Sequence, residues 1–407
     1  MMFLKLAWLN IWRNGRRTMI TVASVFFAVL LAITFRSVTD GVYENMIHNV
    51  VSYSSGYLQI HKKGYWDEQS IENSFEADEE FSKRLLDNPR VTGLMPRLET
   101  FALSSFADKT KGVMVLGIDP TSEEKVNQLN EKVVEGIYFE SNSADQILIG
   151  SGLAEQLNAK VNDTLVLIGQ GYHASSAAGK FNIVGILKLG SPELNSNVIY
   201  MPLKTSQYLH GAENRLTSLS IMLGKTSDLE SSKEAIENVI DTEAYEVMTW
   251  KQMMPEMDQF IEADSSGHYI VIGILYIIIS FGLFGTLLMM TFERNREFGI
   301  LIAIGMKKHL LAYVIQLESI MISLMGCLMG VLGGILIVHL LTEYPVQFSG
   351  SLREVYEDYG FEPIIYFSGN IRIFIYQTLI VLVLATLLSL YPGFKVLRLR
   401  PVDAINS

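Results

Sequence analysis

Four long apolar runs constrain this chain more than any other feature of its sequence. They cover residues 18–38, 269–292, 310–341 and 371–392. About 20 predominantly apolar residues are enough for a helix to cross the roughly 30 Å hydrocarbon core of a bilayer. Because a backbone in lipid must satisfy its hydrogen bonds internally, each run is expected to form a transmembrane helix. The sequence therefore predicts a membrane α-helical protein with four transmembrane helices.

The polar region between the first two runs, residues 39–268, has the pattern of a separate domain. Helical spacing continues beyond both runs at residues 40–51 and 250–269, which predicts stalk helices. The mixture of strand and helix patterns predicts a large α+β extracytoplasmic domain inserted between spans one and two. Strands are expected at 56–61, 114–118, 146–150, 164–168, 181–187, 198–201, 218–223 and 245–249, and short helices at 151–158 and 229–240.

Charge divides the chain in the same way. Residues 40–267 hold 18 Lys and Arg against 34 Asp and Glu, a net charge of −16, and the rest of the chain carries +5. An acidic solvated domain is unsuited to nucleic acid, so no nucleic-acid partner is expected. By the positive-inside rule, the basic segments beside the spans are cytoplasmic, which places both termini inside and the large domain outside. These basic residues are Lys5, Arg13, Arg16, Arg17, Arg294, Arg296, Lys307, Lys308, Lys395, Arg398 and Arg400.

The short segment between the second and third runs, residues 293–309, is the strongest functional signal. It begins Glu-Arg-Asn-Arg-Glu-Phe-Gly-Ile-Leu-Ile-Ala-Ile-Gly-Met, which is amphipathic but too short and too charged to be a span. An ordinary cytoplasmic loop with positive-inside charges is the alternative. Apolar side chains on a charged surface helix favour a partner groove instead. Here they are Phe298, Ile300, Leu301 and Ile304.

Two features of the third run concern packing. Gly326, Gly330 and Gly334 recur every four residues, which bares one helix face for the close approach of another helix. The partner is either the fourth span or another copy of this chain, and the intrachain contact is preferred. Glu318 is a carboxylate within the run, where a charge costs at least about 2.5 kcal/mol on insertion scales. We favour a structural anchor over a proton relay for Glu318.

No constellation of catalytic residues stands out. The patterns G-x-x-x-x-G-K-[ST], H-E-x-x-H, G-x-S-x-G and C-x-x-C do not occur in the sequence. We therefore expect no catalytic residue, no metal site and no cofactor bound by this chain, and no enzymatic activity of its own.

The 293–309 segment resembles a known family signature. Residues 296–306, Arg-Glu-Phe-Gly-Ile-Leu-Ile-Ala-Ile-Gly-Met, are similar to the R-E-φ-G-φ-L-R-A-φ-G pattern of the FtsX/MacB-like ABC transporter permeases, in which φ is apolar. Ile302 stands where an Arg is common. Residues 400–405, Arg-Pro-Val-Asp-Ala-Ile, resemble the R-P-x-E-A-L tail of that family. Residues 6–14 and 149–164 are similar to its N-terminal amphipathic segment and to part of its extracytoplasmic domain.

The resemblance implies a permease subunit of an ABC transporter. A separate ATPase polypeptide would bind ATP and Mg, and a second permease copy, identical or a paralogue, would pair with this one. ATP-driven closure of the ATPases would push a coupling helix, and the stalk helices would pass the movement to the outer domains, which is called mechanotransmission. The coupling residues would be Arg294, Arg296, Glu297, Phe298, Gly299, Ile300, Leu301, Ala303, Gly305 and Met306.

The size of the outer domain resembles that of LolC/LolE lipoprotein-releasing subunits and MacB-type efflux permeases. The leading hypothesis is extraction of lipoproteins from the bacterial inner membrane for transfer toward the outer membrane, with a periplasmic chaperone or adaptor as partner. The alternatives are MacB-like efflux of peptides or drugs and FtsX-like transmembrane signalling. The apolar surface of the first two spans would cradle acyl chains at Phe26, Phe27, Phe281, Phe284, Met289 and Met290.

These expectations divide the chain into consecutive segments. Trp8 and Trp12 place the first of them at headgroup depth, in contact with membrane lipids. The segments are a cytoplasmic amphipathic helix at 1–17, spans at 18–38, 269–292, 310–341 and 371–392, a periplasmic α+β domain with stalk helices at 39–268, a cytoplasmic coupling helix at 293–309, a periplasmic loop at 342–370 and a cytoplasmic tail at 393–407.

Overall fold

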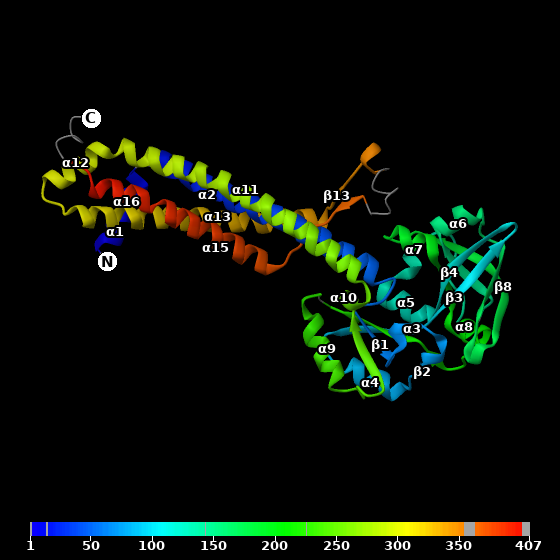
Figure 1. Cartoon of the computed structure of the whole chain (residues 1–407). Coiled ribbons are helices and arrows are strands. Elements are labelled where there is room, and N and C mark those ends of the chain that lie inside the picture. The colour runs from blue at the N-terminus through cyan, green and yellow to red at the C-terminus, as the bar shows by residue number, and fades with distance from the viewer. Residues whose placement is uncertain (1, 14, 143, 225, 354–362, 401–407) are drawn as a thin grey trace. The chain divides into compact units, whose positions relative to one another are not determined.

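The structure is a computed structural model of the 407-residue chain, and it describes residues 2–13, 15–142, 144–224, 226–353 and 363–400. Residues 354–362 of the expected periplasmic loop and residues 401–405 of the family-like tail lie outside this description. The chain divides into two compact units. The helical unit comprises residues 1–43, 260–347 and 364–407, and the sheet unit comprises residues 44–259 and 348–363. Figure 1 labels the helices of both units and some of their strands.

Four helices among the described residues are long and apolar enough to cross a membrane, and they coincide with the four apolar runs. They are α2 (Gly15–Val51), α11 (Pro255–Glu293), α13 (Lys308–Glu343) and the pair α15 (Ile371–Leu388) and α16 (Leu390–Leu397). Two shorter helices, α1 (Met2–Arg13) and α12 (Asn295–Ala303), complete the helical unit. A shared apolar core holds the long helices together, including Val25, Val29 and Ile33 of α2, Leu283 of α11, Cys327 of α13 and Val381 of α15.

Three helix boundaries differ from the sequence-based expectation. Gly15 already belongs to the first turn of α2, so residues 15–17, expected in the N-terminal amphipathic helix, are part of the helix that contains the first span. The second stalk helix is broken at Met254, because Pro255 disfavours helical backbone in the residue before it, and this separates α10 (Trp250–Met253) from α11. Pro392 does not end the fourth span. It lies in the first turn of α16, where N–H groups have no intrahelical acceptor and a missing one costs little.

Ten strands of the sheet unit form one sheet in the order β12-β1-β11-β3-β4-β9-β6-β8-β5, with β7 paired to both β3 and β8. This double pairing closes β3, β4, β9, β6, β8 and β7 into a barrel. Its interior holds Val115, Ile149, Leu165, Ile183 and Ile199. The strands are β1 (Leu58–Lys62), β3 (Val91–Phe106), β4 (Lys109–Ile118), β5 (Val133–Gly136), β6 (Gln146–Gly150), β7 (Thr164–Gln170), β8 (Ser176–Leu187), β9 (Val198–Pro202), β11 (Ser218–Leu223) and β12 (Tyr245–Thr249).

Short helices and one small strand pair accompany this sheet in the sheet unit, and a second small strand pair belongs to the helical unit. The strands β3 and β5 were not predicted from the sequence, whereas the predicted positions of the other eight overlap the observed ones. The helices are α3 (Tyr65–Glu68), α4 (Glu79–Leu86), α5 (Pro120–Asn127), α6 (Ser151–Leu157), α7 (Pro192–Asn197), α8 (Leu203–Leu209) and α9 (Leu229–Glu237), and the small pairs are β2 (Phe75–Glu76) with β10 (Arg215–Leu216) and β13 (Val346–Gln347) with β14 (Ile364–Ile365).

Candidate functional site

The segment between α11 and α13 forms the short helix α12, which ends in a defined turn. The Gly305 N–H donates to the Ile302 carbonyl and the Met306 N–H donates to the Leu301 carbonyl, both at 3.1 Å. This is the bond pattern of a Schellman motif, which needs a residue with positive φ after the helix, and Gly305 has φ +104°. Leu301 and Met306 pack against the same buried cluster, so side chains and backbone fix the turn together.

Gly305→Ala is expected to destabilise the helical unit by about 1–3 kcal/mol, because a side chain at this φ strains the backbone. An added methyl group meets no atom within 4 Å, so the effect is conformational rather than steric. The measurement is the unfolding midpoint of the full chain in mild detergent. Gly267→Ala in α11 is the control, since that site is equally open and alanine favours a helix. Equal destabilisation by both changes would contradict the assignment.

One face of α12 is buried inside the chain. Phe298 is 1% exposed and packs with Leu311 and Ile315 of α13 and Val396 of α16. Leu301, Ile302 and Met306 are partly buried against the same cluster. This contact fastens α12 to two of the long helices, α13 and α16, through apolar packing.

The opposite face of α12 is open to solvent. It presents Arg296, Ile300, Ala303 and Ile304, which share one side because they are three or four residues apart. Ile300 is 47% exposed and Ile304 is 76% exposed. Two exposed isoleucines beside a charged residue on a nine-residue helix form a small apolar surface suited to a partner groove.

A chain of ion pairs connects α12 to α1 and α13. Arg13 Nη2 of α1 lies 2.6 Å from Glu297 Oε2, and Arg294 Nε lies 3.4 Å from the same oxygen. Arg294 Nη1 donates to Glu318 Oε1 of α13 at 2.6 Å, and both of these side chains are buried. The Arg294 guanidinium also lies 5.3 Å from the centroid of the Phe298 ring. Glu318 therefore has a cationic partner, which agrees with its interpretation as a structural anchor.

The predicted coupling residues thus fall into different environments. Arg294, Phe298 and Gly299 are buried, so a partner docking on α12 would not reach their side chains. Arg296, Ile300, Ala303 and Gly305 are exposed, and Glu297, Leu301 and Met306 are intermediate. Sequence reasoning did not include Arg13 or Val396 in this site, because no local pattern pairs them with residues almost 100 or more positions away.

The glycine stripe of α13 lies against α2, the first span, and not against the fourth. A Cβ on Gly326 would lie 2.5 Å from Val25 Cβ and 2.9 Å from the Val22 carbonyl oxygen. Gly330 and Gly334 face Val29 and Ile33 of α2 in the same way. The glycine stripe therefore makes an intrachain contact, as preferred, but its partner is the first span instead of the fourth. Because the glycines have no side chains, the backbones of α2 and α13 can approach closely.

The six residues expected to cradle acyl chains do not line one cavity. Phe26 and Phe27 line a cavity of about 470 Å³ between α1, α2 and α13. Met289 and Met290 line another, of about 390 Å³, between α2 and α11. Phe281 is exposed, and Phe284 packs edge-on to Tyr391 of α16. Within one chain these residues therefore face different surroundings, because side chains on one helix point to different sides of it, and their role in cradling acyl chains stays a prediction.

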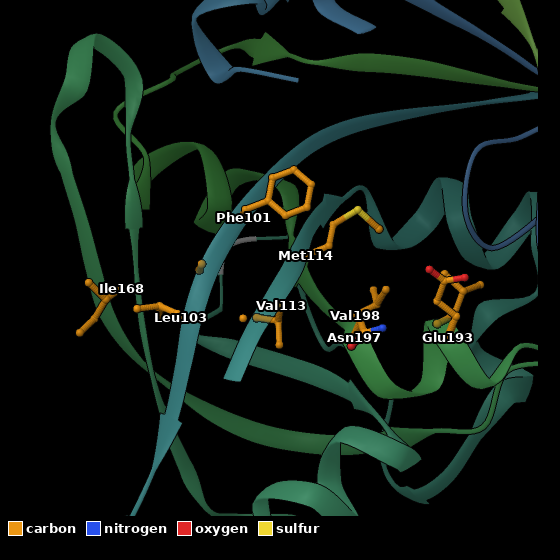
Figure 2. A pocket seen from close by; sticks show the side chains of 11 residues that line it. Phe101, Leu103, Val113, Met114, Ile168, Glu193, Asn197 and Val198 are labelled. Carbon is orange, nitrogen blue, oxygen red and sulfur yellow. The ribbon is translucent and has the colours of Figure 1, made fainter. Parts of the chain in front are cut away.

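A further cavity of about 540 Å³ lies in the sheet unit (Figure 2). Phe101 and Leu103 of β3 line this cavity together with Met114 of β4 and Ile168 of β7. Glu193 of α7 also lines it. Strand pairing brings these side chains together, because Phe101 is opposite Met114 and Leu103 is opposite Ile168. Three of these apolar side chains are exposed, which makes the cavity a candidate contact surface that was not predicted.

His61 is the histidine of the sheet unit with the clearest environment. It is fully buried on β1, and burial lowers its pKa to about 3, so it is neutral at physiological pH. Its Nε2 lies 2.7 Å from Gln59 Oε1, and its ring packs near those of Tyr65 and Trp66. This is the environment of a packed core histidine.

Comparison with known proteins covers most of the chain. The family profile described as MacB-like periplasmic core domain matches residues 18–239, and the profile described as FtsX-like permease C-terminal matches residues 269–401. The lipoprotein-releasing system transmembrane protein LolE of Haemophilus influenzae is 22% identical over 333 residues, 80% of either chain. LolC of Neisseria meningitidis serogroup B, a protein of the same description, is 22% identical over 80% of this chain and 78% of its own. The macrolide export ATP-binding/permease protein MacB of Escherichia coli is 20% identical over 96% of this chain and 58% of its own.

Proposed function

This chain belongs to the family of ABC transporter permeases with a MacB-like periplasmic core domain and an FtsX-like C-terminal region, and on that premise we propose that it is a permease subunit of a lipoprotein-releasing transporter. The similarity to LolE and LolC along about four fifths of each chain carries this proposal. The proposed activity is extraction of lipoproteins from the bacterial inner membrane for transfer toward the outer membrane, through a periplasmic chaperone or adaptor.

In the proposed arrangement, α12 is the coupling helix and binds a separate ATPase on the cytoplasmic side. The exposed face with Ile300 and Ile304 would enter a groove of the ATPase, which would bind ATP and Mg. The buried face would pass the movement to α13 and α16 through Phe298, and the ion pairs of Arg294 would pass it to α13. The long helices α2 and α11 would carry it toward the sheet unit, with a second permease copy completing the transporter.

The double change Ile300→Asp/Ile304→Asp is expected to reduce the ATPase recovered with the full chain by about tenfold or more, because each carboxylate would have to be buried in an apolar groove. The measurement is the ratio of ATPase to permease after affinity purification from native membranes in mild detergent. Tyr208→Asp is the control, because Tyr208 is at least as open to solvent as either isoleucine but lies on α8 of the sheet unit. An unchanged ratio of ATPase to permease in the double variant would contradict the assignment of α12 as the coupling helix.

A second candidate function is efflux of peptides or drugs, favoured by the match of MacB along 96% of this chain. The two candidates differ in what accompanies the chain from its native membrane. An ATPase together with acylated lipoproteins, identified by mass spectrometry, is the expected result. An ATPase with an adaptor protein and no lipoprotein would replace the proposal by efflux. An ATPase with a cell-wall hydrolase would indicate a signalling subunit.

A further inference from the structure

The end of α2 is held by side chains of the sheet unit. The helix ends at Val51, and the next three carbonyl oxygens, of residues 52–54, all accept hydrogen bonds from side chains that are distant in the sequence. We call the three donor residues, together with the glutamate that pairs with one of them, the α2 clamp. They are Arg97 of β3 and Glu123 and Asn127 of α5, two elements labelled in Figure 1, and Tyr200 of β9.

Arg97 is the centre of the α2 clamp. Its guanidinium donates to the Ser54 carbonyl through Nη1 and to the Ser52 carbonyl through Nη2 at 3.5 Å. Its other N–H groups bind the Glu123 carboxylate, with Nε to Oε1 at 2.8 Å and Nη2 to Oε2 at 3.1 Å. Both side chains are completely buried, so the pair is stable only while each charge has its partner.

The other two clamp residues complete the same contact. Asn127 Nδ2 donates to the Ser52 carbonyl at 3.0 Å and also to Glu123. The Tyr200 hydroxyl donates to the Tyr53 carbonyl at 2.8 Å. These carbonyls belong to the turn that directly follows α2, outside the helical hydrogen-bond pattern, so the side chains of a cation and two neutral donors supply their hydrogen bonds. The last turn of α2 is thereby fixed to three elements of the sheet unit.

The connection into α11 is built differently. After β12 the chain forms the four-residue helix α10, whose N-terminus is capped by a capping box between Thr249 and Gln252. The backbone then becomes non-helical at Met254, with φ −126° and ψ 64°. Only after this residue does α11 begin, at Pro255. A helix that ends in a clamp transmits both displacement and rotation, whereas a non-helical residue between two helices allows the dihedral angles to absorb part of a movement.

We propose that Arg97 and Glu123 are positioning residues of the transport cycle, which make the last turn of α2 and the barrel move as one body. Movement of α2 therefore reaches the sheet unit through the α2 clamp, and α11 follows through the joint at Met254. The origin of that movement at an ATPase rests on the proposed function, but the clamp itself does not.

The test uses the full chain in mild detergent and three variants. Arg97→Met/Glu123→Met removes both buried charges, keeps the volume apolar and is expected to fold. Arg97→Lys keeps a cation but loses the fork of donors, so it is expected to give an intermediate result. Arg215→Met is the matched control, because Arg215 binds Ser74 in the same unit through two hydrogen bonds, at 2.7 and 2.6 Å, without touching α2.

The first measurement is amide hydrogen exchange of residues 48–56, followed by mass spectrometry. The amides of Ser52, Ser54 and Gly56 bind the carbonyls of residues 48, 50 and 51 in the last turn. In Arg97→Met/Glu123→Met they are expected to exchange about tenfold faster than in the wild-type chain, with no change in Arg215→Met. Equal exchange rates in the two variants would overturn the clamp, whatever the chain transports.

The second measurement compares exchange with and without ATP and Mg in the complex that contains the co-purified ATPase. In the wild-type complex, ATP is expected to change exchange in both α12 and the barrel. Arg97→Met/Glu123→Met is expected to keep the change in α12 and lose at least half of that in the barrel, at an unchanged unfolding midpoint. If this variant keeps the ATP-dependent changes in exchange in both α12 and the barrel, the α2 clamp only stabilises the fold and does not transmit movement. Absence of any change in α12 of the wild-type complex would contradict the proposed function instead.

Discussion

Arg294→Met is expected to lower the free energy of unfolding by about 3–5 kcal/mol, because it leaves the Glu318 carboxylate buried without its cation. The two side chains are 4% and 3% exposed, and their closest N–O distance is 2.6 Å. Glu318 lies within α13, an apolar helix long enough to cross a membrane, where hydrocarbon cannot solvate an unpaired charge. The measurement is unfolding of the full chain in mild detergent as a denaturing detergent is added.

A second ion pair near α12 gives the matched control. Arg13 and Glu297 are also 2.6 Å apart, but their side chains are 57% and 43% exposed, so Arg13→Met is expected to cost at most about 1 kcal/mol. The double change Arg294→Met/Glu318→Leu is expected to regain most of the lost stability, since no buried charge then lacks a partner. Similar losses for Arg294→Met and Arg13→Met would show that burial does not set the strength of these pairs.

The sheet unit shows which strands local sequence patterns reveal. β1, β6, β11 and β12 have apolar or alternating side chains, and their predicted positions agree closely with the observed ones. β3 was missed because Pro96 and Glu99 are unfavourable in strands and the charged Arg97 interrupts the apolar pattern between them. Pro96 is tolerated because the pairing with β4 begins only at Arg97, so β11 alone lies beside it.

The polar residues of β3 are stabilised by contacts that the sequence does not reveal. Arg97 binds Glu123, 26 residues away, and Glu99 accepts a hydrogen bond from Ser218, 119 residues away, at 2.6 Å. Burial raises the pKa of the Glu99 carboxyl, and the hydrogen bond from Ser218 acts against this shift. A buried polar residue cannot be distinguished from an exposed one without knowing such partners, and this is why the α2 clamp was not predicted.

In the helical unit too, the sequence pattern predicts where the helices lie along the chain but not which helix faces pack together. The length and hydropathy of the runs predicted the four long helices, because lipid imposes both requirements locally. The partner of each helix face is not a local property. Phe26 and Met289 have the same apolar character, yet they line different cavities, and Phe298 and Ile300 lie two residues apart on opposite faces of α12. Apolar side chains in a membrane protein favour lipid and protein surroundings almost equally.

Gly326→Leu is expected to have a large steric effect in the helical unit, with a loss of stability of about 3 kcal/mol or more. Even the first carbon of the new side chain would lie 2.5 Å from Val25 Cβ and 2.9 Å from the Val22 carbonyl oxygen. Neither atom is the end of a flexible side chain, so α2 and α13 must move apart, and the packing of the neighbouring Gly330 and Gly334 is lost with them. The measurement is again detergent-induced unfolding of the full chain.

Gly282→Leu separates this clash from the effect of adding leucine to an apolar helix. Gly282 lies in α11, and a Cβ there meets no atom within 4 Å, so the change is expected to be neutral or slightly stabilising through helix propensity. A reciprocal exchange tests the contact directly. Gly326→Ala is expected to destabilise the chain, and Val25→Gly in the same chain to restore part of the loss, because the methyl groups then no longer compete for one position. Independent effects of these two changes would mean that the backbones of α2 and α13 are not in contact at Gly326.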